Sequence, residues 1–372
     1  MIFTCLQENL SKGISTVGRA ISARSPLPIL SNVLLVAEGG RLKLTASNME
    51  TSITLYVGAS VEKDGAITIP AKLFSEFVSN LSPSTLTAEL KDNILHVSTD
   101  KTKSKFNGVD ASSYPSLPEL KADSLFIEVD PKEFTSAVML VAFSAASDET
   151  RPVLTGVLVH LKDGLLTLAS ADGYRLSEKT LKVKNNKTED FSVILPAKTL
   201  IEVSRIFSSV GDKLKISINK EDNLALFESE GISVSTRIID GAFPDYKKLI
   251  PSEASHKAEF YSNDLLEAVK LTNVFSKGAE NHSPITVHIN PEGYISLASV
   301  STESGENKTK IEATVEGDAL DVVFNSKFLL DFLNNIKAER LILSSNGNLT
   351  PGVVRAPETD DYVHLIMPIR NQ

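Results

Sequence analysis

The sequence predicts an α+β protein in which one arrangement of antiparallel sheets and two helices is written three times. Three similar phrases, IPAKLFSEFVSNL (69–81), LPAKTLIEVSRIF (195–207) and FNSKFLLDFLNNI (324–336), place their lysines 126 and 129 residues apart. One third of the 372 residues is 124, so the repeat has the length of a whole domain and is too long for a solenoid unit. We therefore expect three domains of one fold.

The three phrases predict amphipathic helices, because their apolar residues recur at i, i+3, i+4 and i+7 and so share one helix face. The middle phrase has Ser204 in this stripe. A second helix precedes each phrase and follows a short strand. Its apolar stripe begins at Leu10 in the first copy and at Phe134 in the second, and it is weaker around Leu265 in the third.

The strands repeat with the same period. RLKLTASN (41–48), LLTLASAD (165–172) and YISLASVS (294–301) alternate apolar and polar residues, and a glycine turn precedes each of them. This pattern is typical of antiparallel strands linked by tight turns. Runs of such strands with few helices favour the α+β class over alternating βαβ units.

Two proline-rich segments, SSYPSLPEL at 112–120 and GAFPDYKKLIP at 241–251, separate the copies. Clusters of proline, serine and glycine between periodic segments indicate connections between domains. The predicted domains are residues 1–121, 122–253 and 254–372.

The chain has 38 basic and 47 acidic residues, a net charge of −9. This balance argues against indiscriminate attraction to polyphosphate, so any contact with nucleic acid must be local. Cys5 is the single cysteine, which excludes an internal disulfide and a cysteine-based metal cluster. The sequence has no signal-peptide pattern and no apolar stretch of membrane-spanning length, so we expect a cytoplasmic protein that does not contact a membrane.

Enzyme motifs are missing from the sequence. It has no phosphate-binding loop, no serine nucleophile elbow, no HExxH zinc motif and no dinucleotide fingerprint. Asp172 and Glu178 are a conceivable carboxylate pair, but Asp-Gly after a strand is first of all a turn signal. A single active site also has no use for three similar copies. We expect no catalytic residue, no cofactor and no metal.

One lysine stands in the first turn of each phrase's helix: Lys72, Lys198 and Lys327. The helix dipole disfavours a cation there by roughly 0.3 to 1 kcal/mol. An ion pair with the acid four residues later would stabilise the helix by only ~0.2 to 0.5 kcal/mol. These acids are Glu76, Glu202 and Asp331. The spacing alone does not decide between such pairs and a positive surface that holds a polyanion loosely.

Five phrases together resemble the family of bacterial DNA polymerase III beta subunits, the sliding clamps. They are SPLPILSNVLL (25–35), RPVLTGVLV (151–159), ADGYRL (171–176), DGAFPDYKKLIP (240–251) and YVHLIMPIR (362–370). The resemblance covers the whole chain in order. It implies the DNA clamp fold and a head-to-tail homodimer that closes a six-domain ring around double-stranded DNA, with helices lining the hole and sheets outside.

The implied ring is geometrically sound. Twelve helices at ~10 Å spacing, each ~10 Å thick, leave a hole of ~28 Å, which is wider than a DNA duplex. Six helices from a single chain would leave only ~9 Å. The implied function therefore requires the dimer.

The resemblance implies a processivity factor that holds DNA by topology and catalyses nothing. Its implied partners are duplex DNA of any sequence, the clamp loader, the replicative polymerase and other proteins with short clamp-binding peptides. The alternative is a protein-interaction scaffold of the same fold that never encircles DNA, and an enzyme is a more distant one. Asn371 and Gln372 extend beyond the family's usual ending, and Tyr174 stands where histidine is frequent.

The resemblance also implies the site residues. Those expected to face DNA are Arg24, Lys72, Lys198 and Lys327. Those expected at the dimer interface are Lys103, Lys105 and Phe106 on one side and Val274, Phe275, Glu303 and Glu306 on the other. Phe106 is expected to meet Val274 and Phe275, and the lysines to face the acidic segment.

Partner peptides are expected in a groove between domains two and three. The implied residues are Leu154, Ala171, Gly173, Tyr174, Arg175, Leu176, Pro244, Leu249, Met367, Pro368, Ile369 and Arg370. The apolar members suit a leucine or phenylalanine anchor, Met367 adds an adaptable wall, and Arg175 is expected to offer its guanidinium at the rim. From the residues alone, Leu176 and Leu249 are equally consistent with ordinary core.

Overall fold

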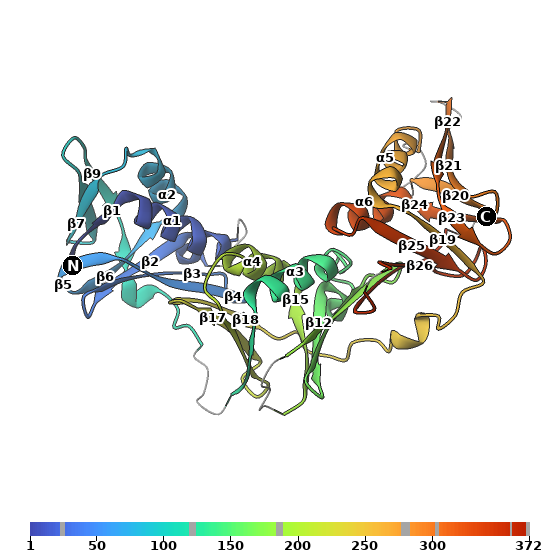
Figure 1. Cartoon of the computed structure of the whole chain (residues 1–372). Coiled ribbons are helices and arrows are strands. Elements are labelled where there is room, and N and C mark those ends of the chain that lie inside the picture. Colours follow the sequence, from blue (N-terminus) through green and yellow to red (C-terminus); the bar gives the residue numbers. More distant parts are fainter. Residues whose placement is uncertain are drawn as a thin grey trace. The chain divides into compact units, whose positions relative to one another are not determined.

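The computed structural model describes residues 1–22, 27–118, 124–183, 189–276, 283–301, 305–357 and 359–369. The chain divides into two compact units. The first is built on residues 1–132 and 202–238, and the second on residues 133–183, 190–201 and 239–372. Each unit consists of two antiparallel sheets with helices (Figure 1). The expected α+β class is confirmed, while the domain boundaries near 121 and 253 stay predictions.

The first unit holds a five-stranded and a nine-stranded sheet. In spatial order, the five strands are β5 (Ala59–Lys63), β1 (Ile2–Leu6), β7 (Thr85–Lys91), β8 (Ile94–Ser98) and β9 (Lys103–Asn107). The nine are β10 (Val109–Asp110), β6 (Gly65–Pro70), β2 (Asn32–Glu38), β3 (Arg41–Ser47), β4 (Thr51–Val57), β18 (Ile232–Arg237), β17 (Leu224–Ser229), β16 (Leu214–Asn219) and β11 (Leu125–Val129). The pair β4 and β18 joins strands that are far apart in sequence.

The second unit holds a nine-stranded and a four-stranded sheet. The nine strands are β15 (Phe191–Pro196), β12 (Gly156–Lys162), β13 (Leu165–Ala171), β14 (Arg175–Lys182), β27 (Tyr362–Ile366), β26 (Gly352–Arg355), β25 (Arg340–Ser345), β19 (His256–Tyr261) and β23 (Thr314–Glu316). The four are β22 (Gly305–Glu312), β21 (Tyr294–Ser301), β20 (Pro284–Asn290) and β24 (Leu320–Asn325).

The repeated phrases are the helices α2 (Ala71–Asn80), α4 (Ala197–Phe207) and α6 (Ser326–Asn335). Their first residues finish the strands β6, β15 and β24, and the helix begins at the next residue. In the third copy the Asn325 side chain caps the helix by accepting the Lys327 backbone N–H at 3.0 Å. The three predicted helices are confirmed.

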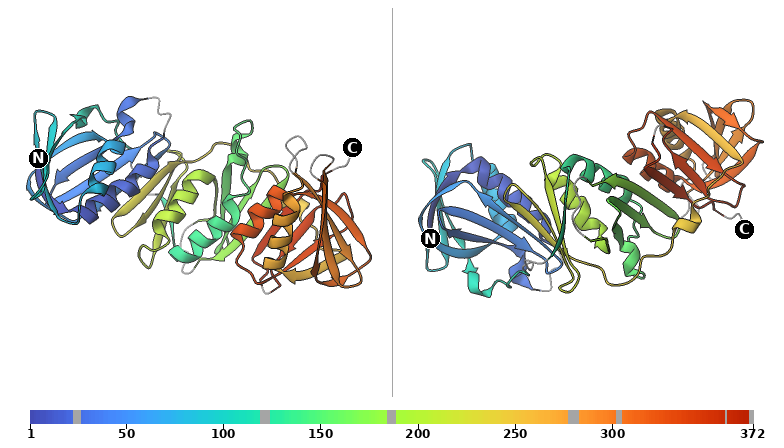
Figure 2. Two further views of the ribbon diagram at one scale, coloured as in Figure 1. Left: turned by 90° about the horizontal axis from the view of Figure 1, so that it is seen from above. Right: turned by 60° about the horizontal axis from the view of Figure 1, so that its bottom comes forward.

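The other helix of each copy is α1 (Gln7–Val17), α3 (Pro131–Ala142) or α5 (Ser262–Asn273). In the first unit, α1 and α2 lie side by side (Figure 2). Gly13 of α1 lets the helix approach β3 and β4 closely, because a Cβ there would lie only 2.8 Å from side-chain carbons of Leu44 and Val57. No helix within the described part of the chain has the length and apolar character that crossing a bilayer requires.

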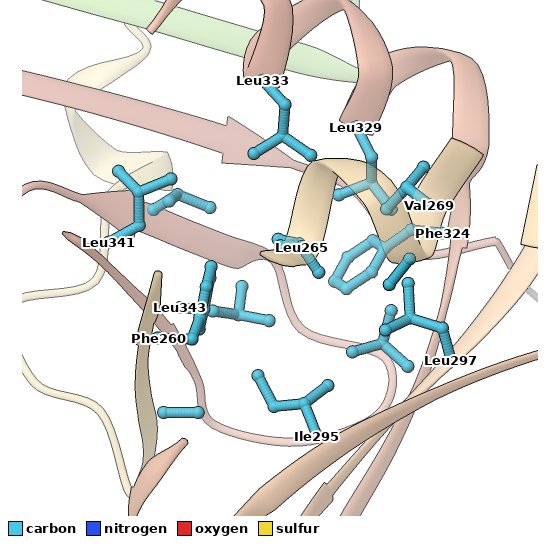
Figure 3. Packing of buried hydrophobic residues seen from close by; sticks show 14 of the residues in the cluster. Phe260, Leu265, Val269, Ile295, Leu297, Phe324, Leu329, Leu333, Leu341 and Leu343 are labelled. Carbon is cyan, nitrogen blue, oxygen red and sulfur yellow. The ribbon is translucent and has the colours of Figure 1, made fainter. Parts of the chain in front are cut away.

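The core of the second unit shows how the helix stripes are used (Figure 3). Leu265 and Val269 of α5 and Leu329 of α6 are buried against residues from the strands. Phe324 and Leu341 are among these strand residues. Burying each such side chain contributes roughly 1.5–3 kcal/mol relative to exposure, so the repeated apolar stripe is what fixes each helix to its sheets.

Candidate functional site

The three repeated lysines are exposed. Lys72, Lys198 and Lys327 are each the second residue of α2, α4 or α6. Their ammonium groups therefore stand in water near the start of a helix, in three equivalent places of the repeat. Arg24, the fourth residue expected to face DNA, lies outside the described residues.

The acids four residues after these lysines do not pair with them within the described part of the chain. Glu202 accepts from Arg19 at 2.9 Å and from Arg205 at 2.5 Å. Asp331 accepts from Arg175 at 2.6 Å. The ion-pair interpretation of the lysines is therefore not supported, and their role in facing DNA stays a prediction.

Two sheets end in edge strands that carry the expected interface residues. Among the described residues, β9 pairs only with β8, and β22 pairs only with β21. Lys103 and Lys105 of β9 and Glu306 of β22 are exposed. An edge strand presents a row of free backbone N–H and C=O groups to a further strand. Glu303 lies outside the described residues.

Phe106 is a core residue and not the exposed aromatic side chain that its expected role requires. Strand alternation turns it inward between exposed neighbours, and only 6% of it is exposed. Its ring meets those of Phe74 and Phe77 edge-on, with centroids 5.1 and 5.0 Å away. Of the residues expected opposite it, Val274 is 61% exposed and Phe275 is half-buried. Substituting Phe106 would therefore damage the core as well as any interface.

The ADGYRL segment forms a tight turn between β13 and β14. The Asp172 carboxylate accepts the backbone N–H groups of Tyr174 and Arg175, both at 2.9 Å. Gly173 has φ +92°, a left-handed conformation that favours glycine. This arrangement leaves Tyr174 62% exposed at the tip of the turn.

The C-terminal segment lies against this turn. Strand β27 pairs with β14, and Leu176 is opposite Leu365. Beyond the strand, the Met367 N–H donates to the Tyr174 carbonyl at 2.7 Å, and the Ile369 N–H donates to the Val323 carbonyl at 2.7 Å. Two of the three segments expected to form the groove are thus joined directly.

The third segment, 241–251, packs on the same sheet. Tyr246 is buried in a cluster with Leu176 and Val353, and Phe243 and Met367 are packed against it. The Tyr246 hydroxyl donates to the Glu178 carboxylate. Burial and this carboxylate raise the pKa of Tyr246. The three segments therefore pack together in the structure, while their role as a peptide site stays a prediction.

The remaining residues expected at the pocket differ in exposure. Leu154 and Leu176 are 6% and 2% exposed, so Leu176 is core that the pocket would share as its floor. Leu249 is 53% exposed and is not core. Gly173 and Pro244 are exposed, whereas Ala171, Met367, Pro368 and Ile369 are half-buried. Arg370 lies outside the described residues.

Arg175 is not at the rim. Its side chain is only 9% exposed, and it donates to Asp172 at 2.9 Å and to Asp331 at 2.6 Å. Its guanidinium lies over the ring of Phe328, 4.7 Å from the centroid. The rim position was expected together with the family resemblance; two carboxylates and an aromatic face hold the side chain inside.

Several residues near the pocket were not predicted. The Phe328 ring stacks on Tyr174, with centroids 6.3 Å apart. His364 is fully buried, hydrogen-bonds the Ser177 hydroxyl at 2.8 Å and stacks on Phe332. The buried contact of His364 could not be predicted locally, because it joins residues 187 positions apart.

A second turn of the same design occurs in the first unit. Asn48 accepts the N–H groups of Glu50 and Thr51, and the Arg237 N–H donates to the Glu50 carbonyl at 2.9 Å. The side chains beneath differ, because Ser52 is opposite Ser235 there. The apolar floor is thus a property of the second unit's side chains and not of the repeated backbone.

No group of three or more His, Cys, Asp or Glu side chains is positioned to hold a metal ion in the described part of the chain. Burial raises the pKa of the Cys5 thiol to about 12, so this cysteine is a packing residue.

Comparison with known families gives three matches in order along the chain. Family models of the DNA polymerase III beta subunit match residues 1–118 with the N-terminal domain, 128–245 with the central domain and 247–370 with the C-terminal domain.

Individual relatives match over the full length. The beta sliding clamp of Bacillus subtilis is 27% identical and that of Streptococcus pneumoniae serotype 4 is 30% identical, each match covering 100% of both chains. The crystal structure of the Bacillus subtilis DNA polymerase sliding clamp superimposes with a TM-score of 0.94 at 26% identity, and that of the Streptococcus pneumoniae DNA polymerase III beta chain with 0.93 at 29%. Both cover 100% of each chain.

Proposed function

The chain belongs to the DNA polymerase III beta subunit family, the beta sliding clamps, and on this basis we propose that two copies close into a ring around double-stranded DNA. It is a DNA sliding clamp in replication and not an enzyme. The observation that carries this conclusion is the full-length match to clamps in both sequence and fold.

The two edge strands support the proposed dimer. In a head-to-tail arrangement, β9 of one chain would lie beside β22 of the other, and both sheets would gain the hydrogen-bonding partner that each lacks at that edge. Lys103 and Lys105 would then meet a segment that carries Glu306. Such exposed pairs contribute at most ~1 kcal/mol each, so the backbone ladder and apolar contacts supply most of the stability.

The exposed lysines support loose attraction to the DNA backbone. Phosphate contacts carry no base information, so they position the ring on any sequence. The net charge of −9 limits tight adhesion. A replication protein works where the chromosome lies, which makes the bacterial cytoplasm its expected location.

Reversing the charge of the helix-start lysines is expected to weaken the hold on DNA and to leave the dimer intact. With Lys72→Glu and Lys198→Glu combined, each dimer loses four cationic contacts. Loading onto nicked circular DNA by the clamp loader should be impaired, because inward phosphate contacts become repulsive. Gel filtration of DNA-bound clamp after a fixed loading time measures this. Adding Arg24→Glu should deepen the defect.

Lys162→Glu in β12, also exposed but on a strand, is the matched control and should behave as wild type. Equal loading of the control and the double variant would remove these lysines from the DNA-facing surface.

The pocket in the second unit is the proposed docking place for peptides of the polymerase, the clamp loader and other partners. Its floor is apolar, with Leu176, Val353 and Leu365 in one cluster. Leu249 and Tyr174 are exposed and available to a peptide. A leucine or phenylalanine side chain from a peptide would find a desolvated floor, and Met367 would adapt its wall to either.

A further inference from the structure

The side chain of Arg175 connects two segments that are 156 residues apart. Its Nε donates to Asp172 Oδ2 at 2.9 Å, in the turn before β14. Its Nη1 donates to Asp331 Oδ2 at 2.6 Å, on α6. The same Asp172 carboxylate, through Oδ1, holds the backbone N–H groups of the turn. One arginine thus fixes both the shape of the turn and its distance from α6.

The surroundings of this arginine favour a single position. The guanidinium lies over Phe328 of α6, and the ring of Phe143 lies 5.7 Å from it. Cations are attracted to such aromatic faces. Asp172 is 13% exposed and Asp331 is 36% exposed. Water therefore competes only weakly with the ion pair between Arg175 and Asp172. Arg175 Nε and Nη1 are already engaged, which leaves little of this side chain for a ligand.

The two connected segments would form the walls of the proposed peptide pocket. Tyr174 of the turn stacks on Phe328 of α6, and its carbonyl accepts the Met367 N–H. A shift of the turn relative to α6 would therefore move Tyr174 and Met367 together. Bidentate and stacked arginines resist replacement by other residues because their planar fork has a fixed geometry.

We propose that Arg175 is a positioning residue that, through Asp331, holds the two walls of the pocket at the spacing a peptide requires, and that it does not itself bind the peptide. This inference rests on the proposed function of the pocket. It predicts that substitutions of Arg175 and Asp331 have non-additive effects on peptide affinity. An arginine that contacts the peptide would instead show non-additive effects with an acid of the peptide.

A double-mutant cycle separates these two roles. The variants are Arg175→Gln, Asp331→Asn and their combination. The probes are a labelled synthetic peptide with an apolar Leu-Phe end and one aspartate, and the same peptide with asparagine instead. Each single variant should weaken binding by about 10-fold, and the double variant should be no weaker than the worse single, because residues that act together are not additive. In all variants, the ratio of the affinities for the two peptides should equal that of the wild type.

Effects that multiply in the double variant would overturn the proposal, as would an asparagine peptide whose binding is insensitive to Arg175→Gln. Asp361→Asn is the matched control. It breaks the 2.6 Å ion pair with Lys179, which lies at the end of the β14–β27 pair away from the turn. It should bind both peptides like wild type.

Hydrogen exchange provides a readout that needs no peptide. The Met367 amide should exchange faster in Arg175→Gln and in Asp331→Asn, with little change at Asp361→Asn. Unchanged protection of Met367 in both variants would overturn the positioning role. If wild type bound neither peptide, the pocket assignment would fail, and hydrogen exchange would still decide whether Arg175 holds the two walls.

Discussion

Deletion of residues 367–372 is expected to abolish binding of a clamp-binding peptide and to leave the dimer intact. The deletion removes Met367 from the pocket wall and two backbone hydrogen bonds, to Tyr174 and Val323. Such bonds contribute about 0.5–1.5 kcal/mol each to stability, which the fold can lose. Loss of a central contact at a hot spot costs 2 kcal/mol or more, so affinity should fall by at least ~30-fold.

Fluorescence anisotropy with a labelled polymerase C-terminal peptide measures this loss. Removal of Asn371 and Gln372 alone is the matched control and should bind at full strength. Full-strength binding by the longer deletion would exclude the groove in the second unit as the peptide site.

The second unit is expected to lose stability in mild acid because of His364. This side chain is fully buried, and its Nε2 has no hydrogen-bond partner among the described residues. Burial lowers its pKa to about 3, with the nearby Arg175 charge adding to the effect. The unfolded chain has the ordinary value near 6.5. The folded pKa is the lower one, so the stability contribution is complete above pH ~6.5 and is lost as pH falls towards 3.

The slope approaches ~1.4 kcal/mol per pH unit below pH ~6, and the loss between pH 6.5 and 4.5 is about 2 kcal/mol. Denaturant titrations across this range measure it. His364→Gln can still bond Ser177 but cannot titrate, so its stability should fall less with pH. His96→Gln in β8 of the other unit is the control. If the free energy of unfolding changed with pH equally in wild type and His364→Gln, His364 would not take up a proton on unfolding.

Local patterns predicted the elements well for a physical reason. The stripe of the 69–81 phrase and the alternation of RLKLTASN depend on neighbours in sequence, and α2 and β3 follow them closely. Asp172-Gly173 was correctly interpreted as a turn, because its hydrogen bonds are local. Interactions between sequence neighbours are therefore enough to predict these elements.

The burial of the site residues was harder to predict, because it depends on contacts between residues far apart in sequence. Phe106 lies in a strand whose outer residues are charged, and nothing local reveals that Phe74 and Phe77 cover it. Arg175 is buried by Asp331 and Phe328. The convergence on the pocket came from resemblance to a family and not from periodicity, since the β14 and β27 pairing joins residues almost 190 positions apart.

Release of the clamp from linearised DNA tests the central claim most directly. Clamp is loaded on nicked circular DNA, the circle is cut once, and DNA-bound protein is measured by gel filtration. A ring that holds DNA by topology should stay on the uncut circle and leave once the circle is cut, and proteins bound at both ends should prevent the loss. Equal retention on cut and uncut DNA, with or without blocked ends, would contradict encirclement and favour a scaffold that binds DNA from one side.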